Sequence, residues 1–309
     1  MPENTSQNHN IPVDVLCVGH ACYDLTFGVD HHIGKNEKMM ASAFTGCGGG
    51  PAANAAFTAS RLGIRTAFIG YLGKDFYGEQ HFRELQQERV VVDFIARGEA
   101  PTPVSMVLVK PGGSRSVVNY RKKTPPLAAG YFSLDQCDPR VILFDGHEPG
   151  LSVRLAKEAD ARRIPTVLDA GSVHLGTEKL IREVDYLVVS EKFAYQYTSR
   201  RNAEQALRAL QRITDTVIVT LGERGLIWGR GGKYGKMSAL PVKVNDTNGA
   251  GDAFHGAFCA GLSQGMEWDD VLLYASSAAA GCCTRLGGRG GLPTQGEVLA
   301  MMKKYGSTK

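Results

Sequence analysis

The sequence contains 309 residues, 43% of them hydrophobic, and its 35 basic and 31 acidic residues give a net charge of +4. A chain of this length buries a sizeable core without disulfides, and so balanced a charge argues against a nucleic-acid-binding or membrane-surface protein. No run of 18 apolar residues predicts a membrane span, and the polar residues 1–10 lack a signal-peptide core. We expect a flexible tail at 1–10 and a single domain at 11–309.

The seven cysteines indicate a reduced, cytoplasmic protein with buried thiols. Their number is odd, no Cys-x-x-Cys pair occurs, and Cys282 and Cys283 are adjacent. Disulfide frameworks and zinc sites use even numbers or paired spacings instead.

Short apolar runs alternate with helical patterns along most of the chain. The expected elements, in chain order, are a strand at 13–19, a helix at 51–63, strands at 66–70 and 141–146, a helix at 151–163, strands at 166–171 and 186–190, a helix at 203–213, a strand at 216–222 and helices at 253–263, 268–283 and 295–305. This strand–helix–strand order predicts an α/β fold with a mostly parallel central sheet and helices on both faces.

Two segments interrupt the alternation and predict a small second sheet that acts as a lid. Residues 104–120 form two β-rich runs around a Pro-Gly-Gly-Ser turn, which indicates a hairpin. Another β-like stretch lies at 39–45, so we place the lid at about 20–45 and 104–120.

Two common nucleotide sites are missing. No GxxxxGK[ST] sequence occurs, and the first expected strand ends in "GHACYD" rather than GxGxxG. These absences argue against a Walker-type site and against a hydride-transfer enzyme.

The segment "DTNGAGDAFHGAF" (246–258) has two interpretations. Asp252 can be the N-cap of the helix that follows. Alternatively, the amides of Gly249, Ala250 and Gly251 bind an anion at the helix start, and Asp252 acts beside it as a base.

The segment "GCGGGPAANAAFTASRLG" (46–63) has two interpretations as well. The glycines leave room for a polyol, and Asn54 offers it a donor and an acceptor. The alternative is a tight strand–helix turn with an internally satisfied asparagine.

These two segments, in this order, together with "VTLGERG" (219–225), resemble the signatures of the ribokinase family of PfkB carbohydrate kinases. The resemblance extends from about 13 to 305. It implies a ribokinase-like three-layer sandwich with a β-sheet lid. The implied activity is transfer of the γ-phosphate of ATP to a hydroxyl of a small sugar.

The resemblance also implies roles for individual residues. Asp252 would be the base that deprotonates the sugar hydroxyl, and the amides of Gly249, Ala250 and Gly251 would form the anion hole. The residues that would contact the sugar are Asp24, Gly49, Gly50, Asn54 and Asp252.

The remaining implied roles concern the nucleotide, metal ions and assembly. Thr220, Gly222 and Gly225 match the ATP loop, and Asp246 matches a residue that helps to hold a monovalent cation such as K⁺. Mg²⁺ would accompany ATP, and the lid would form a homodimer interface. Many members carry Asn-x-x-Glu at positions 190–193, but this chain has Ser190 and Phe193 at its ends, which weakens direct protein contacts to Mg²⁺.

In motif detail the chain is most similar to the sulfofructose kinase branch. "GGGPAA" and "TRLGGRGGLP" (284–293) match it, and Lys38 and Asn119 match positions that contact the sulfonate. His147 stands where that branch has an arginine, so a neutral ketose and an anionic sugar both remain open.

Two alternatives to a sugar kinase remain. A nucleoside kinase of the same fold would place an aromatic ring over the base, and Phe44 or Tyr120 could serve. A catalytically weak regulatory or binding protein is favoured only by Ser190 and Phe193.

Overall fold

The computed structural model describes residues 11–121 and 123–306, so the tail expected at 1–10 lies outside the described residues. The larger of its sheets has eight strands and is parallel except at one edge. In spatial order they are β14 (Lys233–Met237), β13 (Leu226–Arg230), β12 (Thr216–Thr220), β11 (Tyr186–Ser190), β10 (Thr166–Ala170), β9 (Val141–Phe144), β1 (Val15–Val18) and β4 (Thr66–Ile69).

The strands in the middle of this sheet are buried on both faces. On β1, for example, Val15 and Cys17 belong to one apolar cluster, and Leu16 and Val18 belong to the other. Successive strand side chains point to opposite faces, so a continuous apolar strand supplies two cores at once.

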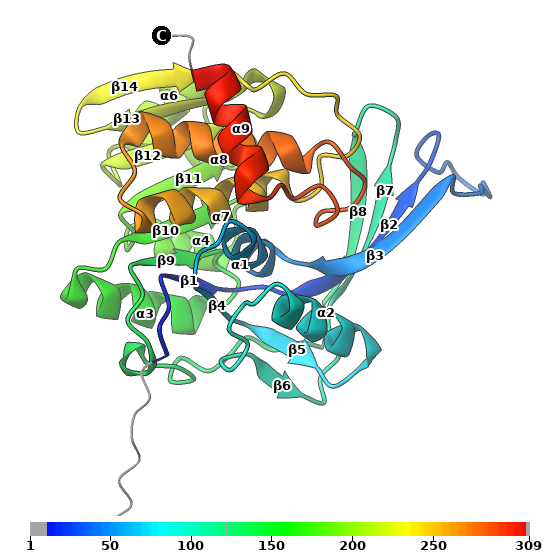
Figure 1. The fold of residues 1–309 in the computed structure, drawn as a ribbon, viewed down its shortest axis with the longest axis horizontal. Coiled ribbons are helices and arrows are strands. Elements are labelled where there is room, and N and C mark those ends of the chain that lie inside the picture. Colours follow the sequence, from blue (N-terminus) through cyan, green and yellow to red (C-terminus); the bar gives the residue numbers. More distant parts are fainter. Residues whose placement is uncertain (1–10, 122, 307–309) are drawn as a thin grey trace, which may run out of the picture.

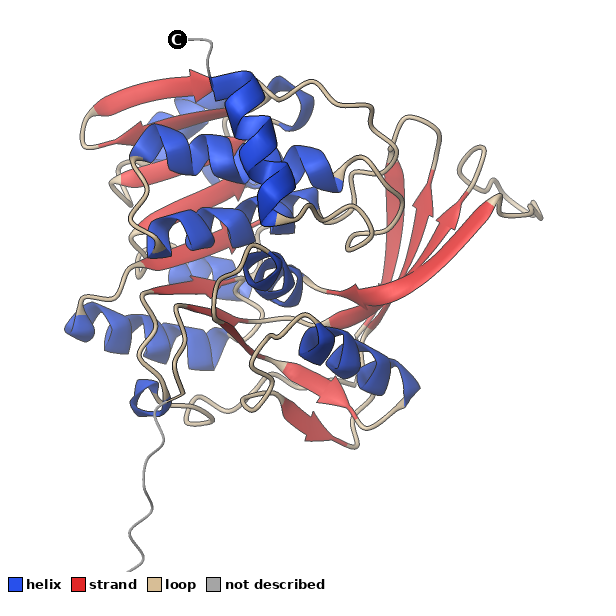
Figure 2. Ribbon diagram, in the orientation of Figure 1, coloured by secondary structure: helices blue, strands red, loops and turns tan. Residues whose placement is uncertain are grey.

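Helices cover both faces of the larger sheet and complete the three layers (Figure 2). The first cluster includes residues of α1 (Pro51–Arg61), α7 (Ala250–Ser263), α8 (Trp268–Cys282) and α9 (Gln295–Gly306). The second includes residues of α3 (Pro149–Arg162), α4 (Leu175–Leu180), α5 (Glu191–Thr198) and α6 (Ala203–Leu210). This is the layered α/β fold that the sequence predicts. No helix in the described part of the chain is long and apolar enough to cross a membrane.

A second sheet of four strands projects from one side of the molecule, at the right of Figure 1. Its order is β3 (Ala43–Gly49), β2 (Cys22–Gly28), β7 (Val104–Val109) and β8 (Arg115–Tyr120). Strands β7 and β8 pair in antiparallel fashion around residues 110–114, which confirms the expected hairpin.

The remaining elements are small. Helix α2 (Phe76–Gln87) packs against β3, and β5 (Tyr71–Gly73) pairs in parallel with β6 (Ala96–Gly98). Two short 3₁₀ turns are η1 (Leu134–Gln136) and η2 (Gly222–Arg224).

The strand expected at 39–45 is displaced in the structure. Strand β3 runs from Ala43 to Gly49 and therefore includes glycines that we assigned to a turn. Glycine is normally weak in a strand. Here a Cβ at Gly48 would overlap the Arg289 guanidinium, and a Cβ at Gly49 would overlap the Asp24 carboxyl group, so the bare backbone makes room for those side chains.

Candidate active site

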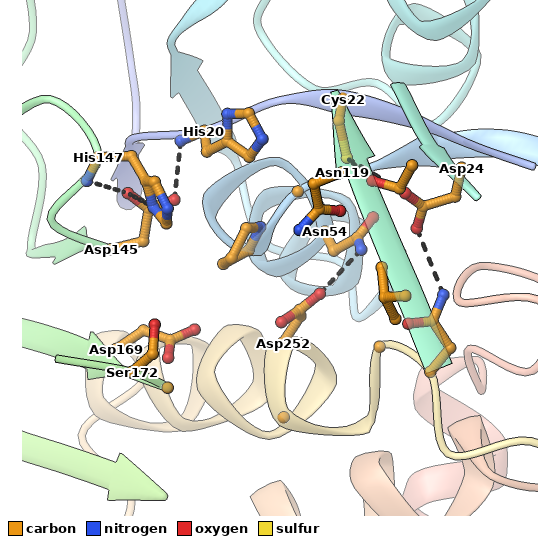
Figure 3. A pocket seen from close by; sticks show the side chains of 18 of the residues that line it. His20, Cys22, Asp24, Asn54, Asn119, Asp145, His147, Asp169, Ser172 and Asp252 are labelled. Carbon is orange, nitrogen blue, oxygen red and sulfur yellow. Dashed lines mark hydrogen bonds and ion pairs between the residues drawn. The ribbon is translucent and has the colours of Figure 1, made fainter. Parts of the chain in front are cut away.

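A pocket of about 490 Å³ lies at the carboxyl ends of the parallel strands and beneath the second sheet (Figure 3). His20 follows β1, Asp145 follows β9, and Asp169 is the last residue but one of β10. Ser190 and Thr220 end the next two strands. Ligands of open α/β sheets bind at this edge, because the strand ends and following loops converge there.

The start of α7 forms one wall of the pocket. The helix begins at Ala250, its N-cap is Gly249 with φ of 76°, and Asp252 lies inside the first turn. The interpretation of Asp252 as the N-cap is therefore wrong. Gly249, Gly251 and Asp252 line the pocket, whereas Ala250 does not, and its amide lies 3.4 Å from the Thr247 carbonyl oxygen. The positive end of the helix dipole thus faces the pocket.

The Asp252 carboxylate meets Asn54, which projects from the first turn of α1 (Figure 3). Asn54 Nδ2 donates a 2.8 Å hydrogen bond to Asp252 Oδ2, joining two segments 198 residues apart. Burial raises the pKa of Asp252, while the bond from Asn54 and the nearby His255 oppose that rise. A raised pKa makes the carboxylate a stronger base toward a hydroxyl proton.

Asp24 approaches from the second sheet. It lies within β2 rather than in a loop, and its Oδ2 accepts a 3.3 Å hydrogen bond from Asn248 Nδ2. Gly49 lies against the Asp24 carboxyl group without lining the pocket, whereas Gly50 lines it.

Three imidazole rings form the opposite wall, and only His147 was singled out in the sequence. The ring centroids of His20 and His147 are 5.0 Å apart, and those of His147 and His174 are 4.7 Å apart. Burial, reinforced by His147, lowers the pKa of His20 to about 3. Burial also lowers the pKa of His174. His147 alone behaves differently.

Asp145 explains why His147 differs from the other two rings. Its Oδ1 lies 3.3 Å from His147 Nδ1, and it accepts bonds from the backbone N–H groups of His20 and His147. Burial opposes the charge of both partners, but their mutual attraction outweighs it: the pKa of Asp145 is lowered and that of His147 is raised. His147 is therefore the ring of this wall that keeps its proton to the highest pH.

A second buried pair lies beside the start of α7. His255 Nδ1 lies 3.3 Å from Asp169 Oδ2 and 2.7 Å from the carbonyl oxygen of Gly251. Burial raises the pKa of Asp169 to about 6. Sequence reasoning missed this pair, because nothing local links residues on β10 and α7.

The residues expected to contact an anionic group or a nucleoside base are only partly brought together. Asn119 and Tyr120, at the end of β8, line the pocket. Lys38 lies exposed on the loop between β2 and β3 and does not line it. The Phe44 ring is also outside the lining and packs against Phe27, with centroids 5.0 Å apart.

The expected nucleotide loop follows β12. Thr220 lines the pocket, whereas Gly222 and Gly225 belong to the η2 turn just beyond the lining residues. Gly225 has φ of 89°, and a Cβ there would overlap the Met237 carbonyl oxygen. The turn therefore requires glycine at this position.

The segment that departs from Asn-x-x-Glu has a structural role in this chain. Ser190 is the N-cap of α5 and accepts a 3.0 Å bond from the Phe193 amide. Phe193 is fully buried in the second apolar cluster. Glu191 forms an ion pair with Arg224. A core phenylalanine thus occupies the position at which many family members have a glutamate.

Asp246 lies in the loop before α7 and is fully buried. Its Oδ1 accepts a 2.8 Å bond from the Asn248 amide, and its Oδ2 accepts a 2.9 Å bond from the Gly287 amide. The bond from Gly287 holds the loops before α7 and after α8 together. Within residues 11–121 and 123–306, no group of three or more His, Cys, Asp or Glu side chains is arranged to hold a metal ion.

The family model of the pfkB family carbohydrate kinases matches residues 13–295. A ribokinase of Bacillus subtilis is 25% identical over 293 residues, covering 94% of this chain and 99% of the relative. A fructokinase of Solanum tuberosum is 28% identical over 290 residues, covering 85% and 88%.

Solved structures show the same fold. A putative ribokinase from Agrobacterium tumefaciens superposes with a TM-score of 0.86 at 26% identity, covering 97% of this chain and all of that one. The ribokinase of Arabidopsis thaliana complexed with ribose and ATP gives 0.80 at 22% identity, covering 95% and 99%. The chain therefore belongs to the pfkB family of carbohydrate kinases, phosphotransferases with an alcohol group as acceptor.

Proposed function

We propose that this chain is an ATP-dependent sugar kinase in which Asp252 accepts the proton of the attacking hydroxyl. The observation that carries the proposal is the hydrogen bond between Asn54 and Asp252, because it brings the two glycine-flanked segments to one point of the pocket. The phosphoryl donor then lies against the start of α7, and the acceptor lies between α1 and the second sheet.

The proposed reaction uses groups that are already in position. The acceptor hydroxyl loses its proton to an Asp252 oxygen while its own oxygen attacks the γ-phosphorus, and ADP leaves. The amides of Gly249 and Gly251 and the α7 dipole stabilise the charge on the phosphoryl oxygens, whereas the Ala250 amide donates to the Thr247 carbonyl oxygen. Asp24 and Asn54 hold the acceptor, so catalysis depends mainly on position and electrostatics.

The nucleotide would extend from the turn before α7 toward Thr220 and the η2 turn, where Gly222 and Gly225 shape the loop. Mg²⁺, when bound with ATP, would neutralise phosphate charge while held by nucleotide oxygens and water, since Phe193 replaces a carboxylate. We also propose a monovalent cation such as K⁺ near Asp246. Both Asp246 oxygens already accept backbone hydrogen bonds, so they do not face the cation freely.

For the acceptor, we favour a sugar that carries an anionic group, as in the sulfofructose kinase branch. His147 replaces the branch arginine, but Arg121 lines the pocket beside it and donates to the His147 carbonyl oxygen at 3.3 Å. Together with Asn119, these residues can supply the positive charge and the donors that a sulfonate or carboxylate requires.

An acceptor screen tests this proposal. The panel contains ribose, fructose, a sugar acid, a sulfonated fructose, adenosine and inosine, and the readout is acceptor-dependent ADP release. We expect the highest kcat/KM with an anionic sugar. A preference for neutral ketoses would remove the anionic-acceptor proposal, a preference for nucleosides would indicate a nucleoside kinase, and no turnover would favour a binding or regulatory protein.

The raised pKa of His147 makes the same proposal testable by pH. A group with a raised pKa keeps its positive charge to a higher pH than usual and loses it as pH rises through that pKa. We therefore expect KM for an anionic acceptor to increase as pH rises through the pKa of His147, while KM for a neutral sugar stays constant. Parallel KM profiles for both acceptors would contradict a cationic His147 subsite.

We also propose a homodimer through the second sheet. The face opposite the pocket is apolar: Phe27 pairs with Phe44, and Met106 pairs with Val118, which is 60% exposed. Exposed apolar patches of this kind mark interfaces. Light scattering should give twice the chain mass, and Val118→Asp should give a monomer. A monomeric wild-type protein at working concentration would exclude the dimer.

A further inference from the structure

Arg289 is a buried arginine just outside the pocket, in the loop between α8 and α9. Its side chain is 5% exposed to solvent. Nη1 donates to Glu84 Oε2 at 2.7 Å, and Nη2 lies 2.6 Å from His81 Nε2. The guanidinium also lies 4.5 Å from the centroid of the Phe57 ring. It does not line the pocket, so it cannot itself be a contact for substrate there.

The third hydrogen bond of this guanidinium leads to the proposed base. Arg289 Nε donates to Asn54 Oδ1 at 3.1 Å, and Asn54 Nδ2 donates to Asp252 Oδ2 at 2.8 Å (Figure 3 shows the second bond). An arginine can only donate hydrogen bonds, and a carboxylate can only accept them. Only one orientation of the amide therefore satisfies both neighbours, with its oxygen toward Arg289 and its nitrogen toward Asp252.

We propose that Arg289 is a positioning residue for phosphoryl transfer, which holds the Asn54 carbonyl oxygen and so keeps the Asn54 amide donating to Asp252. Without Arg289, the side chain of Asn54 is free to rotate, and its oxygen can face the carboxylate. The kinetic part of this inference rests on the proposed function. The hydrogen-bond chain can be tested without turnover.

The surroundings of Arg289 are built to fix it in place. Glu84 Oε2 accepts both the guanidinium and the backbone N–H of Gly48, at 2.8 Å for the latter. A Cβ at Gly48 would overlap Arg289 and His81. The first glycine of "GGG", Gly48, is thus explained by packing against this arginine. Because Glu84, His81 and the Phe57 ring hold the guanidinium, it presents one donor geometry to Asn54.

His81 lies in this network as a neutral ring. Its Nε2 faces an arginine donor, so that nitrogen must carry the lone pair. Burial, followed by the positive charge of Arg289, lowers the pKa of His81 well below its usual value. The negative partner of Arg289 is therefore Glu84, which leaves the contact to Asn54 as a directional hydrogen bond rather than a charge pair.

A second consequence is a pH dependence of the base. The bond from Asn54 lowers the pKa of Asp252, against the larger effect of burial. Losing the bond should raise that pKa, so the acid limb of activity should move to higher pH. The other titratable groups around the two ends of this hydrogen-bond chain are Cys22, Asp24, Arg115, Asp169, His255 and Cys282 near Asp252, and Tyr23, Cys47, His81 and Glu84 near Arg289. They are present in every variant compared below except the Glu84 control.

A double-mutant cycle tests the proposal. The variants are R289M, N54A and the double variant, and the readouts are the pH profile of kcat and the pKa of Asp252 from ¹³C-carboxyl NMR. D252N assigns the NMR signal. We expect R289M to raise the Asp252 pKa by about one unit, since a hydrogen bond to a charged group is worth roughly that much. On the acid limb of the pH profile, where the ionised fraction of Asp252 limits the rate, kcat should therefore fall about tenfold.

The decisive comparison is the effect of R289M in the N54A background. If Arg289 acts through Asn54, R289M changes neither kcat nor the Asp252 pKa further once Asn54 is absent. Two results would overturn the proposal. One is an equal loss of kcat from R289M in the wild-type and N54A backgrounds, and the other is an Asp252 pKa in R289M that equals that of the wild type. The NMR readout stays valid even if no acceptor is turned over, so failure of the proposed function is distinguishable.

Two further variants serve as controls, one for the charge pair and one for a failure of R289M to fold. E84Q keeps an oxygen acceptor for Gly48 and Arg289 but removes the charge pair, and it should retain a wild-type acid limb. If R289M does not fold, the cycle is repeated with R289K. Its single ammonium keeps the charge but cannot reach all three partners, so we expect a smaller loss that is again absent in the N54A background.

Discussion

Asp252→Asn is expected to lower kcat by about 10²–10⁴-fold, because the amide cannot accept the proton of the acceptor hydroxyl. Binding of ATP and acceptor should change little. The asparagine oxygen can still accept the bond from Asn54 Nδ2 that Asp252 Oδ2 accepts now, so the local geometry survives. Steady-state kinetics and calorimetric binding of each ligand separate the two effects.

A matched control for this substitution is Asp270→Asn. Asp270 is an exposed aspartate in the first turn of α8, as Asp252 is in the first turn of α7, so both substitutions remove one charge from the start of a helix. D270N should keep wild-type kcat. If D252N also keeps it, Asp252 is not the base.

Gly251→Ala is expected to lower kcat/KM by about 10²-fold without destabilising the fold. A Cβ at Gly251 meets no heavy atom within 4 Å, and the residue is exposed at the pocket. The methyl group therefore projects into the space assigned to the phosphoryl group. Displacing the phosphoryl group should lower kcat/KM about as much as losing one donor of an anion hole does.

Gly296→Ala provides the comparison. Gly296 is the second residue of α9, as Gly251 is of α7, and a Cβ there also meets nothing within 4 Å. Both variants should unfold at the same or a higher temperature than the wild type, since alanine is favoured over glycine in a helix by about 1 kcal/mol. Only G251A should lose activity. Wild-type kcat/KM in G251A would place the phosphoryl group elsewhere.

The fold was predictable where burial produces a continuous apolar strand. Runs such as 141–144 and 166–170 are buried at every residue, and the helices between them follow the 3.6-residue period. The antiparallel edge strands β13 and β14 were missed, because β14 is largely exposed and lacks apolar alternation. Strand β3 was displaced because glycines in a strand are read as a turn unless their neighbours are known.

The site was predictable where a local pattern has its own physical reason. A glycine at the helix start and a carboxylate in the first turn are such a pattern, and both Gly249 and Asp252 line the pocket. The N-cap interpretation failed because the helix begins two residues before Asp252. Lys38 is exposed and does not line the pocket. The sequence could not show this, because a lid loop carries no local signal of where it lies relative to the pocket.

Contacts between residues that are far apart in the sequence could not be predicted. Arg289 meets Asn54 from 235 residues away, and His255 meets Asp169 only because α7 packs against the sheet. In the sequence, Arg289 is one arginine in a glycine-rich loop. The missing information is tertiary contact, which no local spacing encodes.

A crystal structure of the D252N variant with ATP and the best acceptor tests the central claim most directly, because slow turnover should preserve the ternary complex. The account predicts an acceptor hydroxyl oxygen within about 3.2 Å of a side-chain atom of residue 252 and a γ-phosphate against the Gly249–Gly251 turn. An acceptor whose nearest hydroxyl lies beyond hydrogen-bond reach of residue 252, or a γ-phosphate bound away from that turn, would contradict it.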